Sequence, residues 1–489
     1  MNDRLDPKRS EAAPSSAEVS IVEQMARTFA AQRAAFAGDM DPSLAARRQR
    51  LDRLLQLTQK HERAIVEAIS ADFGHRSRHE TELADIFLVL SGIRHTRRHL
   101  RRWMRPRRVR TPLHMLPARS ELIPQPLGIV GVISPWNYPF QLAMLPAAAA
   151  LAAGNRVMLK PSELTPKFSA LLQQIVAEFF APEEFAVIAG DVDVGRAFSK
   201  LPFDHLFFTG STAVGRQIAL AAAENLTPVT LELGGKSPAI VDSDCDLDVA
   251  APRIVFGKLL NAGQTCVAPD YMLVPRARVD EFVSAFQRSA ATMYPTLAAN
   301  PDYTSIVSDR HYERLLRLVD DAKAQGATVI RIAPTGEQPA ALGRKLPPML
   351  LVGVDDDMAV MREEIFGPVL PILPYDTLDE AIAYVNRHPR PLALYWFGKS
   401  GANRDRVLRQ TLSGGVTIND ACWHVAQEHL PFGGVGESGI GAYHGEHGFG
   451  TFSKDKPIFH QARLNGFVLF RPPYGRHFET LIALLKRFF

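Results

Sequence analysis

A chain of 489 residues that carries a net charge of only +4 gives no general case for nucleic-acid binding. Its three cysteines make no disulfide framework, which favours a reducing compartment, and no apolar run reaches the ~18 residues that a membrane-spanning helix needs. No N-terminal stretch has the charged start, apolar run and cleavage site of a signal peptide, so we expect a cytoplasmic protein.

The first part of the chain is predicted to be helical. Residues 1–20 are polar and contain proline and serine, which predicts a disordered tail. From Val22 to about Trp103, apolar residues recur at spacings of three and four, while glycine and proline are scarce. The arginine-dense run from Arg94 to Arg110 could indicate a nucleic-acid or membrane surface. Because the rest of the chain is not basic, we favour a solvated helix face that leads into an extended connection.

Beyond Pro124, short apolar runs alternate with longer amphipathic ones. The short runs predict buried strands at residues 127–134, 155–160, 185–190, 205–210 and 227–235. The runs between them predict helices at residues 141–154, 169–180, 195–201 and 211–225. A second series of strands and helices extends from about Gly235 to Pro431. This alternation predicts an α/β fold with two lobes, each built on a largely parallel sheet.

The C-terminal run "RHFETLIALLKRFF" predicts an amphipathic helix. One stripe of it is apolar and is made of Phe478, Leu481, Ile482, Leu485 and Phe489. Arg476, Lys486 and Arg487 lie outside that stripe. Such a basic amphipathic helix could lie in a membrane interface, although it is too short to span a bilayer. Packing against a neighbouring subunit is the alternative, and we favour it.

Cys266 lies in an unusual place for a cysteine. It sits in "LNAGQTCVAPDYMLV", a small, polar, turn-like run, rather than in an apolar stretch. A buried cysteine behaves as an inert small hydrophobe, whereas a reactive one needs access and an environment that favours its thiolate. Cys266 is therefore a candidate nucleophile.

Two loops have the character of cofactor-binding turns. In "FFTGSTAVGRQIA", Gly210 and Gly215 lie where a strand passes into a helix, so backbone N–H groups could hold a pyrophosphate. An ordinary glycine-containing turn explains that pattern equally well. In "LKPSELTP", Lys160 and Glu163 follow a strand and could bind ribose hydroxyls. The alternative is a helix N-terminus that places Glu163 near its positive end.

Two further polar residues stand in apolar surroundings. Asn137 in "SPWNYPF" lies between aromatic residues and prolines, which would make its amide a strong donor to an oxyanion, although it could also cap a helix. Glu232 in "LELGGKSP" lies in a strand of apolar character. Burial raises the pKa of a carboxylate toward the range of a useful base, so the functional interpretation is favoured for Glu232.

Taken together, these motifs resemble those of the aldehyde dehydrogenase superfamily. The resemblance rests on "PWNYP", "LKPSE", "FTGSTAVG", "LELGGKSP", "NAGQTC", "EEIFGPV" and "PFGGVGESG", and it runs from about Phe29 to about Lys454. Finer texture, including "GAYHG", is similar to the class-3 and coniferyl-aldehyde dehydrogenase branch. The resemblance implies NAD(P)-dependent oxidation of an aldehyde to a carboxylic acid. The substrate would be an aromatic or cinnamyl aldehyde, such as coniferyl aldehyde, or a medium- or long-chain aliphatic one.

The resemblance implies catalytic roles for three residues. Cys266 matches the nucleophile that adds to the aldehyde, and the Asn137 amide with the Cys266 N–H matches the oxyanion hole. Glu232 matches the base that activates water to hydrolyse the thioester. No metal is expected. The other two cysteines, Cys245 and Cys422, are interpreted as non-catalytic, with Cys422 nearer the substrate end.

The resemblance also implies a site for NAD or NADP. Glu163 would chelate the ribose hydroxyls of NAD and repel a 2′-phosphate, and Lys160 would partly offset that repulsion, so NAD should be preferred. Glu364 would bind the nicotinamide ribose and Phe366 would flank the ring. The matching cofactor-binding residues are Trp136, Lys160, Glu163, Gly210, Ser211, Gly215, Glu364 and Phe366.

By the same resemblance the chain divides into a Rossmann-like cofactor domain, a catalytic domain and a small oligomerisation arm. The expected boundaries are 21–106 and 123–234 for the NAD(P)-binding domain, 235–434 for the catalytic domain, 107–122 and 435–465 for the arm, and 466–489 for the C-terminal amphipathic helix. A homodimer is expected, with peripheral membrane contact through that helix as the alternative. A relative that transfers the acyl group to CoA fits the chain less well because it has no need of the Glu232 carboxylate. A non-catalytic scaffold fits less well because Cys266, Glu232, Asn137 and Glu364 are all present.

Overall fold

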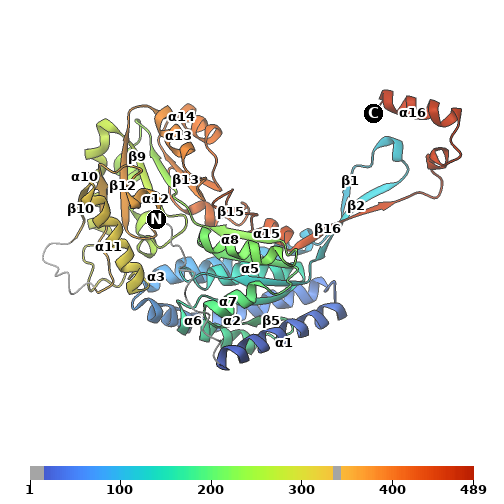
Figure 1. Cartoon of the computed structure of the whole chain (residues 1–489), viewed down its shortest axis with the longest axis horizontal. Helices are drawn as coiled ribbons and strands as arrows, with labels where there is room; N and C mark the ends of the chain where they lie inside the picture. The colour runs from blue at the N-terminus through green and yellow to red at the C-terminus, as the bar shows by residue number, and fades with distance from the viewer. Residues whose placement is uncertain (1–15, 334–342, 489) are drawn as a thin grey trace.

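The computed structural model describes residues 16–333 and 343–488. Within these residues, one sheet has six strands, one has seven and one has three. Figure 1 shows the two larger sheets in separate helix-covered lobes and the small sheet projecting away from them. Both large sheets are mainly parallel. The predicted α/β fold class with two parallel-sheet lobes is therefore confirmed.

The N-terminal segment is helical, as the three- and four-residue spacing predicted. Its elements are α1 (Ser16–Gly38), α2 (Leu44–Phe73), α3 (Arg78–Thr81), the π-helical turn Glu82–Phe87 and α4 (Leu88–Trp103). The Ser43 hydroxyl caps the start of α2, and the helix ends at Gly74, where φ is +77°. Because α1 begins at Ser16, residues 16–20 are helical, and the predicted tail is wrong for them. Residues 1–15 of that tail lie outside the described residues.

The six-stranded sheet has the order β15-β7-β6-β3-β4-β5, and only the edge strand β15 is antiparallel. Its strands are β3 (Ile129–Ile133), β4 (Arg156–Lys160), β5 (Phe185–Val187), β6 (His205–Gly210), β7 (Val229–Leu233) and β15 (Gly439–Ile440). The helices of this lobe are α5 (Gln141–Ala153), α6 (Pro166–Phe179), α7 (Val192–Ser199) and α8 (Thr212–Ala223). Strands β3 to β7 fall within the apolar runs that predicted them, because a strand covered on both faces has a continuous apolar sequence.

The seven-stranded sheet has the order β10-β11-β12-β9-β8-β13-β14, with β10 antiparallel at one edge. Its strands are β8 (Pro238–Val241), β9 (Tyr271–Pro275), β10 (Thr328–Arg331), β11 (Met349–Val352), β12 (Val369–Tyr375), β13 (Ala393–Phe397) and β14 (Gly415–Ile418). The helices of this lobe are α9 (Leu247–Leu259), α10 (Val279–Met293), α11 (Asp309–Ala324), α12 (Ala359–Arg362), α13 (Leu378–Arg387) and α14 (Gly401–Gln410). Strands β8, β9 and β12 are parallel neighbours, so the loops that precede them meet at one edge of the sheet.

The projecting arm is a three-stranded antiparallel sheet of β1 (Arg107–Val109), β2 (Arg119–Pro126) and β16 (Ser453–His460) (Figure 1). Part of the expected arm lies elsewhere. Residues 439–440 form the edge of the six-stranded sheet, and α15 (Gly445–Thr451) packs against α5. These residues lie outside the arm because β15 pairs with β7 of the six-stranded sheet. The chain leaves that lobe only where β16 begins.

The arginine-dense run occupies the end of α4 and passes into β1, as predicted. Its arginine side chains are exposed, and several are paired with acidic residues. Arg97 contacts Asp52 at 2.5 Å, and Arg102 contacts Glu446 at 2.8 Å. The prediction of a solvated helix face that leads into an extended connection is confirmed.

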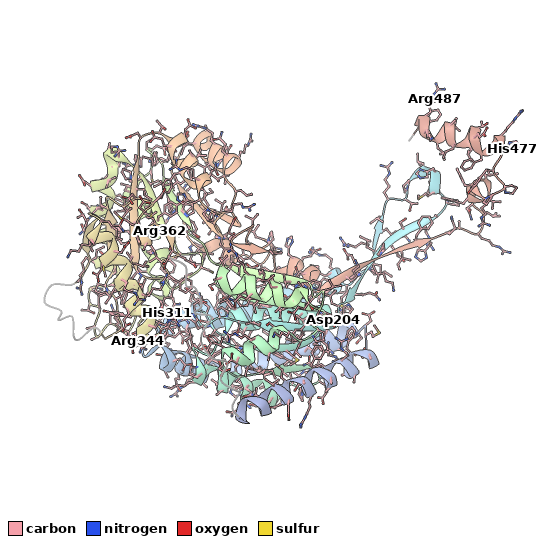
Figure 2. All side chains as sticks on the ribbon, in the orientation of Figure 1. Asp204, His311, Arg344, Arg362, His477 and Arg487 are labelled. Atoms are coloured by element: carbon pink, nitrogen blue, oxygen red, sulfur yellow. The ribbon has the colours of Figure 1, made fainter. Side chains whose placement is uncertain are left out.

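The chain ends in α16 (Arg476–Phe488), which carries His477 and Arg487 and lies far from the two lobes (Figure 2). The expected helix of residues 466–489 is therefore shorter, since Gly466–Phe470 forms a separate 3-10 turn. The apolar stripe is half-buried at Phe478, where the Phe470 and Tyr474 rings pack 6.3 and 4.7 Å away. Phe489 lies outside the described residues. No helix in the described ranges is long and apolar enough to cross a membrane.

Candidate active site

Cys266 lies in a rigid loop between α9 and β9. The chain turns there through the left-handed conformation, with φ values of +54°, +52° and +75° at Asn261, Ala262 and Gly263. The Gln264 side chain fastens the turn, because its Nε2 donates to the carbonyl oxygen of Asn261 at 2.9 Å and its Oε1 accepts from the N–H of Val307 at 2.9 Å. Cys266 is the only half-buried cysteine, the other two being buried. Such a loop gives the sulfur a fixed position with access from one side.

Asn137 is joined directly to the Cys266 loop. Its side-chain Nδ2 donates to the backbone carbonyl oxygen of Gln264 at 3.1 Å. The backbone carbonyl oxygen of Asn137 accepts from Asn261 Nδ2 at 3.0 Å. Arg76 also donates to that carbonyl oxygen, at 2.9 Å. The amide that was expected to hold an oxyanion is therefore fixed beside the nucleophile loop, as that role requires.

Glu232 lies on β7 and is buried, with 3% of its surface exposed. Neither of its carboxylate oxygens has a hydrogen-bond partner among the described residues. Burial alone raises the pKa of Glu232 well above its usual 4.5. Burial and the nearby carboxylates of Glu364 and Glu232 also raise the pKa of the Cys266 thiol. The three groups thus share one electrostatic environment, in which the thiol and the base both hold their protons more firmly than in water.

The loop that carries Glu364 and Phe366 precedes β12 and lies against the Cys266 loop. A Cβ at Gly263 would fall only 2.6 Å from the carbonyl carbon of Gly367, so the two backbones touch. The N–H of Gly235 donates to the Glu364 carboxylate, and burial raises the pKa of that group to about 8. Phe366 has a φ of +54°, a strained conformation for an aromatic residue, which indicates that the surroundings impose its position.

Three charged residues that the sequence did not single out hold this loop in place. Lys236 Nζ pairs with Asp270 and donates to the carbonyl oxygen of Glu363 at 3.1 Å. Arg314 Nη1 donates to the carbonyl oxygen of Ile365 at 2.9 Å. Lys236 lies within the "LELGGKSP" motif. A second charged residue in that short motif, besides Glu232, was the sequence feature that could have identified it. Nothing local distinguished Asp270 or Arg314.

Trp136 contributes an aromatic wall beside Phe366. Its ring centroid lies 5.4 Å from that of Phe366 and 5.1 Å from that of His311, a residue of α11. His311 is labelled in Figure 2 at the end of the seven-stranded lobe that faces the other lobe. Trp136 and Phe366 therefore come together at the junction of the lobes, as expected for residues that flank a bound ring.

Lys160 and Glu163 lie together at the carboxyl end of β4. Lys160 Nζ is 3.5 Å from Glu163 Oε2, and the lysine is buried, which lowers its pKa despite the paired carboxylate. The side chain of Glu163 is 39% exposed. The structure thus places a buried ammonium and an accessible carboxylate at this edge of the sheet, and their contact with a ribose stays a prediction.

The glycines of the turn after β6 are required for close packing. The sequence alone could not distinguish this packing role from a role in binding a pyrophosphate. A Cβ at Gly210 would fall 2.5 Å from the Phe208 ring, and one at Gly215 would fall 2.5 Å from Leu233. The Ser211 hydroxyl accepts from the N–H of Val214 at 3.4 Å and caps α8. These residues allow α8 to pack closely on β7, and its free N–H groups lie at the same sheet edge as Lys160.

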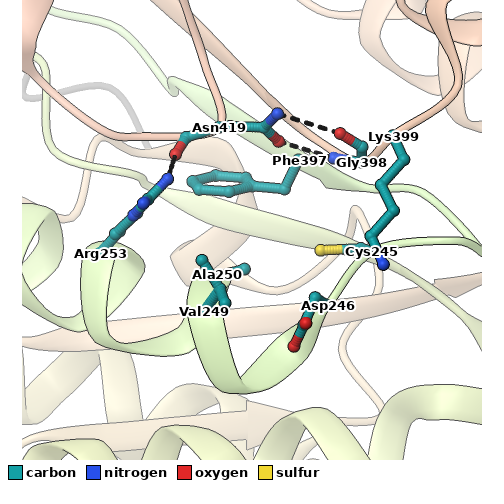
Figure 3. Close-up of a pocket in the computed structure, with 9 residues that line it drawn as sticks. All are labelled: Cys245, Asp246, Val249, Ala250, Arg253, Phe397, Gly398, Lys399 and Asn419. Atoms are coloured by element: carbon teal, nitrogen blue, oxygen red, sulfur yellow. Dashed lines mark hydrogen bonds between the residues drawn. The ribbon is translucent and has the colours of Figure 1, made fainter.

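The other two cysteines are buried outside the candidate site: Cys422 lies behind the Cys266 loop, and Cys245 lies in another pocket. Cys422 is buried, and its Sγ donates to the carbonyl oxygen of Val267 at 3.6 Å, directly behind the nucleophile loop. Burial raises its pKa to about 12. Cys245 lines a separate pocket of about 190 Å³. In its wall the side-chain oxygen of Asn419 accepts a hydrogen bond from the N–H of Gly398 (Figure 3). That pocket contains none of the predicted site residues, and burial raises the pKa of Cys245 to about 11.

Comparisons with known proteins show the family of this chain. A sequence model described as the aldehyde dehydrogenase family matches residues 4–458. A "Probable coniferyl aldehyde dehydrogenase" of Pseudomonas aeruginosa is 52% identical over 95% of this chain and 96% of its own. The aldehyde dehydrogenase family 3 member A2 of Pongo abelii is 41% identical over 87% and 86% of the two chains. The crystal structure of Pseudomonas syringae aldehyde dehydrogenase C, a mutant complexed with NAD+ and octanal, has a TM-score of 0.81 and 31% identity over 91% of this chain and 90% of that chain.

Proposed function

Because this chain belongs to the aldehyde dehydrogenase family, we propose that Cys266, Asn137 and Glu232 oxidise an aldehyde to a carboxylic acid in the site between its two lobes. The enzyme is an NAD(P)-dependent aldehyde dehydrogenase of the class-3 and coniferyl-aldehyde branch. The observation that carries the catalytic assignment is the hydrogen bond from Asn137 to Gln264, which fixes the amide beside the Cys266 loop.

The chain's own residues account for both halves of the reaction. The Cys266 thiol releases its proton to solvent, its sulfur adds to the aldehyde carbon, and the Asn137 amide donates to the oxygen that becomes negative. NAD or NADP, when bound, supplies the acceptor for the aldehyde hydride. Glu232 then removes a proton from the water that attacks the Cys266 thioester. Among the described residues the buried Glu232 carboxylate has no hydrogen-bond partner, which supports hydrolysis over transfer to CoA, because that transfer needs no such base.

The cofactor is proposed to lie along the carboxyl edge of the six-stranded sheet. Lys160 and Glu163 would contact the adenine ribose, and the turn of Gly210, Ser211 and Gly215 would hold the pyrophosphate. At the other end, the ribose next to the nicotinamide would contact Glu364, with Trp136 and Phe366 beside the ring. The buried Lys160 ammonium and the accessible Glu163 carboxylate fit this use. The proposed cofactor domain is 21–106 and 123–234, and the proposed catalytic domain is 235–434.

For the substrate we propose a cinnamyl-type aldehyde such as coniferyl aldehyde. The support is the name of the Pseudomonas aeruginosa relative at 52% identity. A medium-chain aliphatic aldehyde is the second candidate, because the Pseudomonas syringae enzyme was crystallised with octanal. The two are separated by kcat/KM for each aldehyde.

For assembly we propose a homodimer, formed through the arm and supported by α16. The arm exposes Val109, Leu113 and Leu116 well away from the body, and a second copy would cover them. Contact of α16 with a membrane surface is the alternative. The three free cysteines support the proposal that the protein acts in the cytoplasm.

The test is the product formed from coniferyl aldehyde or octanal with NAD. We expect equal amounts of NADH and free carboxylic acid, with no acyl-CoA when CoA is added. Cys266→Ala should abolish turnover and keep cofactor binding, because only the covalent step uses the sulfur. Near wild-type oxidation in that variant would overturn the assignment.

A further inference from the structure

Several buried side chains near the site carry polar atoms without a hydrogen-bond partner in the part of the chain that the structure describes, and three of these side chains lie on or against strands β6 and β7. They are Thr209 Oγ1, both carboxylate oxygens of Glu232, and Tyr443 Oη. All three residues are buried, with 8%, 3% and 1% of their surfaces exposed. Native proteins satisfy such groups with protein or ordered water, because leaving them unpaired costs free energy.

The sheet register places these three groups together. Thr209 on β6 is paired with Glu232 on β7, so both side chains point to the same face. Phe207 precedes Thr209 by two residues and shares that face. The Tyr443 ring packs against the Phe207 ring with centroids 4.9 Å apart. Tyr443 therefore lies over the pair of strands that carries Thr209 and Glu232.

Backbone hydrogen bonds and ring packing hold Tyr443 in place. Tyr443 and Phe432 exchange two backbone hydrogen bonds of 2.8 and 2.9 Å, and their rings are 5.9 Å apart. Four residues earlier, Gly439 pairs with Glu232 itself. Burial and the charges of Glu232 and Cys266 raise the pKa of Tyr443, so its hydroxyl keeps its proton and can act as a donor.

No hydrogen bond joins Tyr443 to Glu232, although the charge of Glu232 acts on the hydroxyl. A small polar molecule between them would satisfy both, and water needs two to four such partners. We propose that Thr209 and Tyr443 are positioning residues that, together with Glu232, hold the water that hydrolyses the Cys266 thioester. This inference rests on the proposed function.

The donor and acceptor count suits that water. It accepts from Tyr443 Oη–H, donates one hydrogen to Thr209 Oγ1 and the other to Glu232. One lone pair then remains for the thioester carbon. As the new O–C bond forms, Glu232 takes the proton, and the C–S bond breaks with its electron pair leaving on Cys266. The Glu232 proton then returns to the sulfur, and the acid departs.

The test separates acylation from deacylation in rapid-mixing experiments with aldehyde and NAD. In Tyr443→Phe and in Thr209→Val we expect the NADH burst to keep its wild-type rate. The later steady rate should fall about tenfold, the effect of one lost hydrogen bond of the usual strength. Intact-mass measurement should find the acyl group accumulating on Cys266. Thr209→Ser keeps a hydroxyl and should retain the wild-type steady rate.

Tyr375→Phe is the matched control. Its hydroxyl is also buried but donates to the carbonyl oxygen of Val241 at 2.6 Å, at the opposite end of β12 from the active-site loop. That variant should keep both rates. The inference is overturned if Tyr443→Phe slows the burst as much as the steady rate, or leaves both unchanged. A wild-type enzyme that forms no acid at all would instead overturn the proposed function.

Discussion

Gly234 lies directly against Glu364, so that a Cβ on the glycine would fall 2.6 Å from the carboxyl carbon. Gly234 follows β7 of one lobe, and Glu364 precedes β12 of the other. The missing side chain therefore lets a loop of the seven-stranded lobe close onto the end of the six-stranded sheet. The proposed ribose contact of Glu364 depends on that approach.

Gly234→Ala should push Glu364 out of place and lower kcat/KM for NAD by roughly tenfold to a hundredfold, because a displacement of about 1 Å can cost that much. Steady-state rates at increasing NAD concentrations measure kcat/KM. Gly450→Ala is the control, since nothing lies within 4 Å of a Cβ there. Equal kinetics in Gly234→Ala and wild type would show that Glu364 does not position the cofactor.

Deacylation should accelerate as the pH rises. Burial raises the pKa of Glu232 above 4.5, so the carboxylate that acts as base becomes ionised only at a higher pH than an ordinary glutamate. Glu232→Gln should remove this dependence and slow deacylation by about 10²–10⁴. Single-turnover decay of the thioester at several pH values is the measurement. The control is Glu224→Gln, at an exposed glutamate, which should leave the pH dependence of deacylation unchanged. A deacylation rate that still depends on pH in Glu232→Gln would show that another base acts.

Glu163→Gln should shift the preference from NAD toward NADP. The carboxylate repels a 2′-phosphate, and the buried Lys160 ammonium 3.5 Å away would then attract it without opposition. The ratio of kcat/KM for the two cofactors is the readout, and we expect wild type to use both with NAD preferred. The control is Glu183→Gln, an exposed glutamate of the same lobe. An unchanged ratio in Glu163→Gln would contradict the proposed ribose contacts.

Arg76→Met should destabilise the fold by about 3–5 kcal/mol of unfolding free energy. Arg76 and Asp85 form an ion pair of 3.0 Å that is completely buried, and the variant leaves the Asp85 charge unpaired. Burial already raises the pKa of Asp85, and the loss of Arg76 raises it further. A raised carboxyl pKa favours the folded state at low pH and penalises it as pH rises, so the deficit should be larger at pH 8 than at pH 5.

Denaturant unfolding of that variant at the two pH values is the measurement. Arg63→Met is the control, because its pairing with Glu67 is exposed to solvent and should contribute nothing measurable. The double variant Arg76→Met, Asp85→Leu should recover much of the stability. A single variant as stable as wild type would show that the buried pair does not support the Asn137 loop.

Deleting Gly475 to Phe489 should weaken dimerisation or lower Tm, because the deletion removes the packing surface that the half-buried Phe478 and Leu481 supply. Sedimentation and thermal melts measure both effects, and co-sedimentation with anionic vesicles should change little. If the full chain binds such vesicles and the shortened chain stays dimeric without binding them, α16 is a membrane contact instead.

The sequence by itself determined the fold class and singled out the candidate reactive groups. Continuous apolar runs marked strands β3 to β7, because strands covered on both faces have no polar side. Cys266 and Glu232 stood out because a thiol in a polar turn and a carboxylate in an apolar strand each contradict their surroundings. Such local contradictions are visible without a structure.

Only the tertiary structure decided how those groups are supported. Gly439, four residues before Tyr443, is paired with Glu232 through β15 and β7, and Arg76 reaches Asn137 across 61 residues. Lys236 pairs with Asp270, 34 residues away, and reaches the carbonyl oxygen of Glu363 across 127 residues, which holds the Glu364 loop. None of these partners has a local periodicity or motif of its own, because a long-range contact depends on which strands become neighbours. The expected arm boundaries failed for the same reason, since the pairing of Gly439 with Glu232 holds that segment in the body.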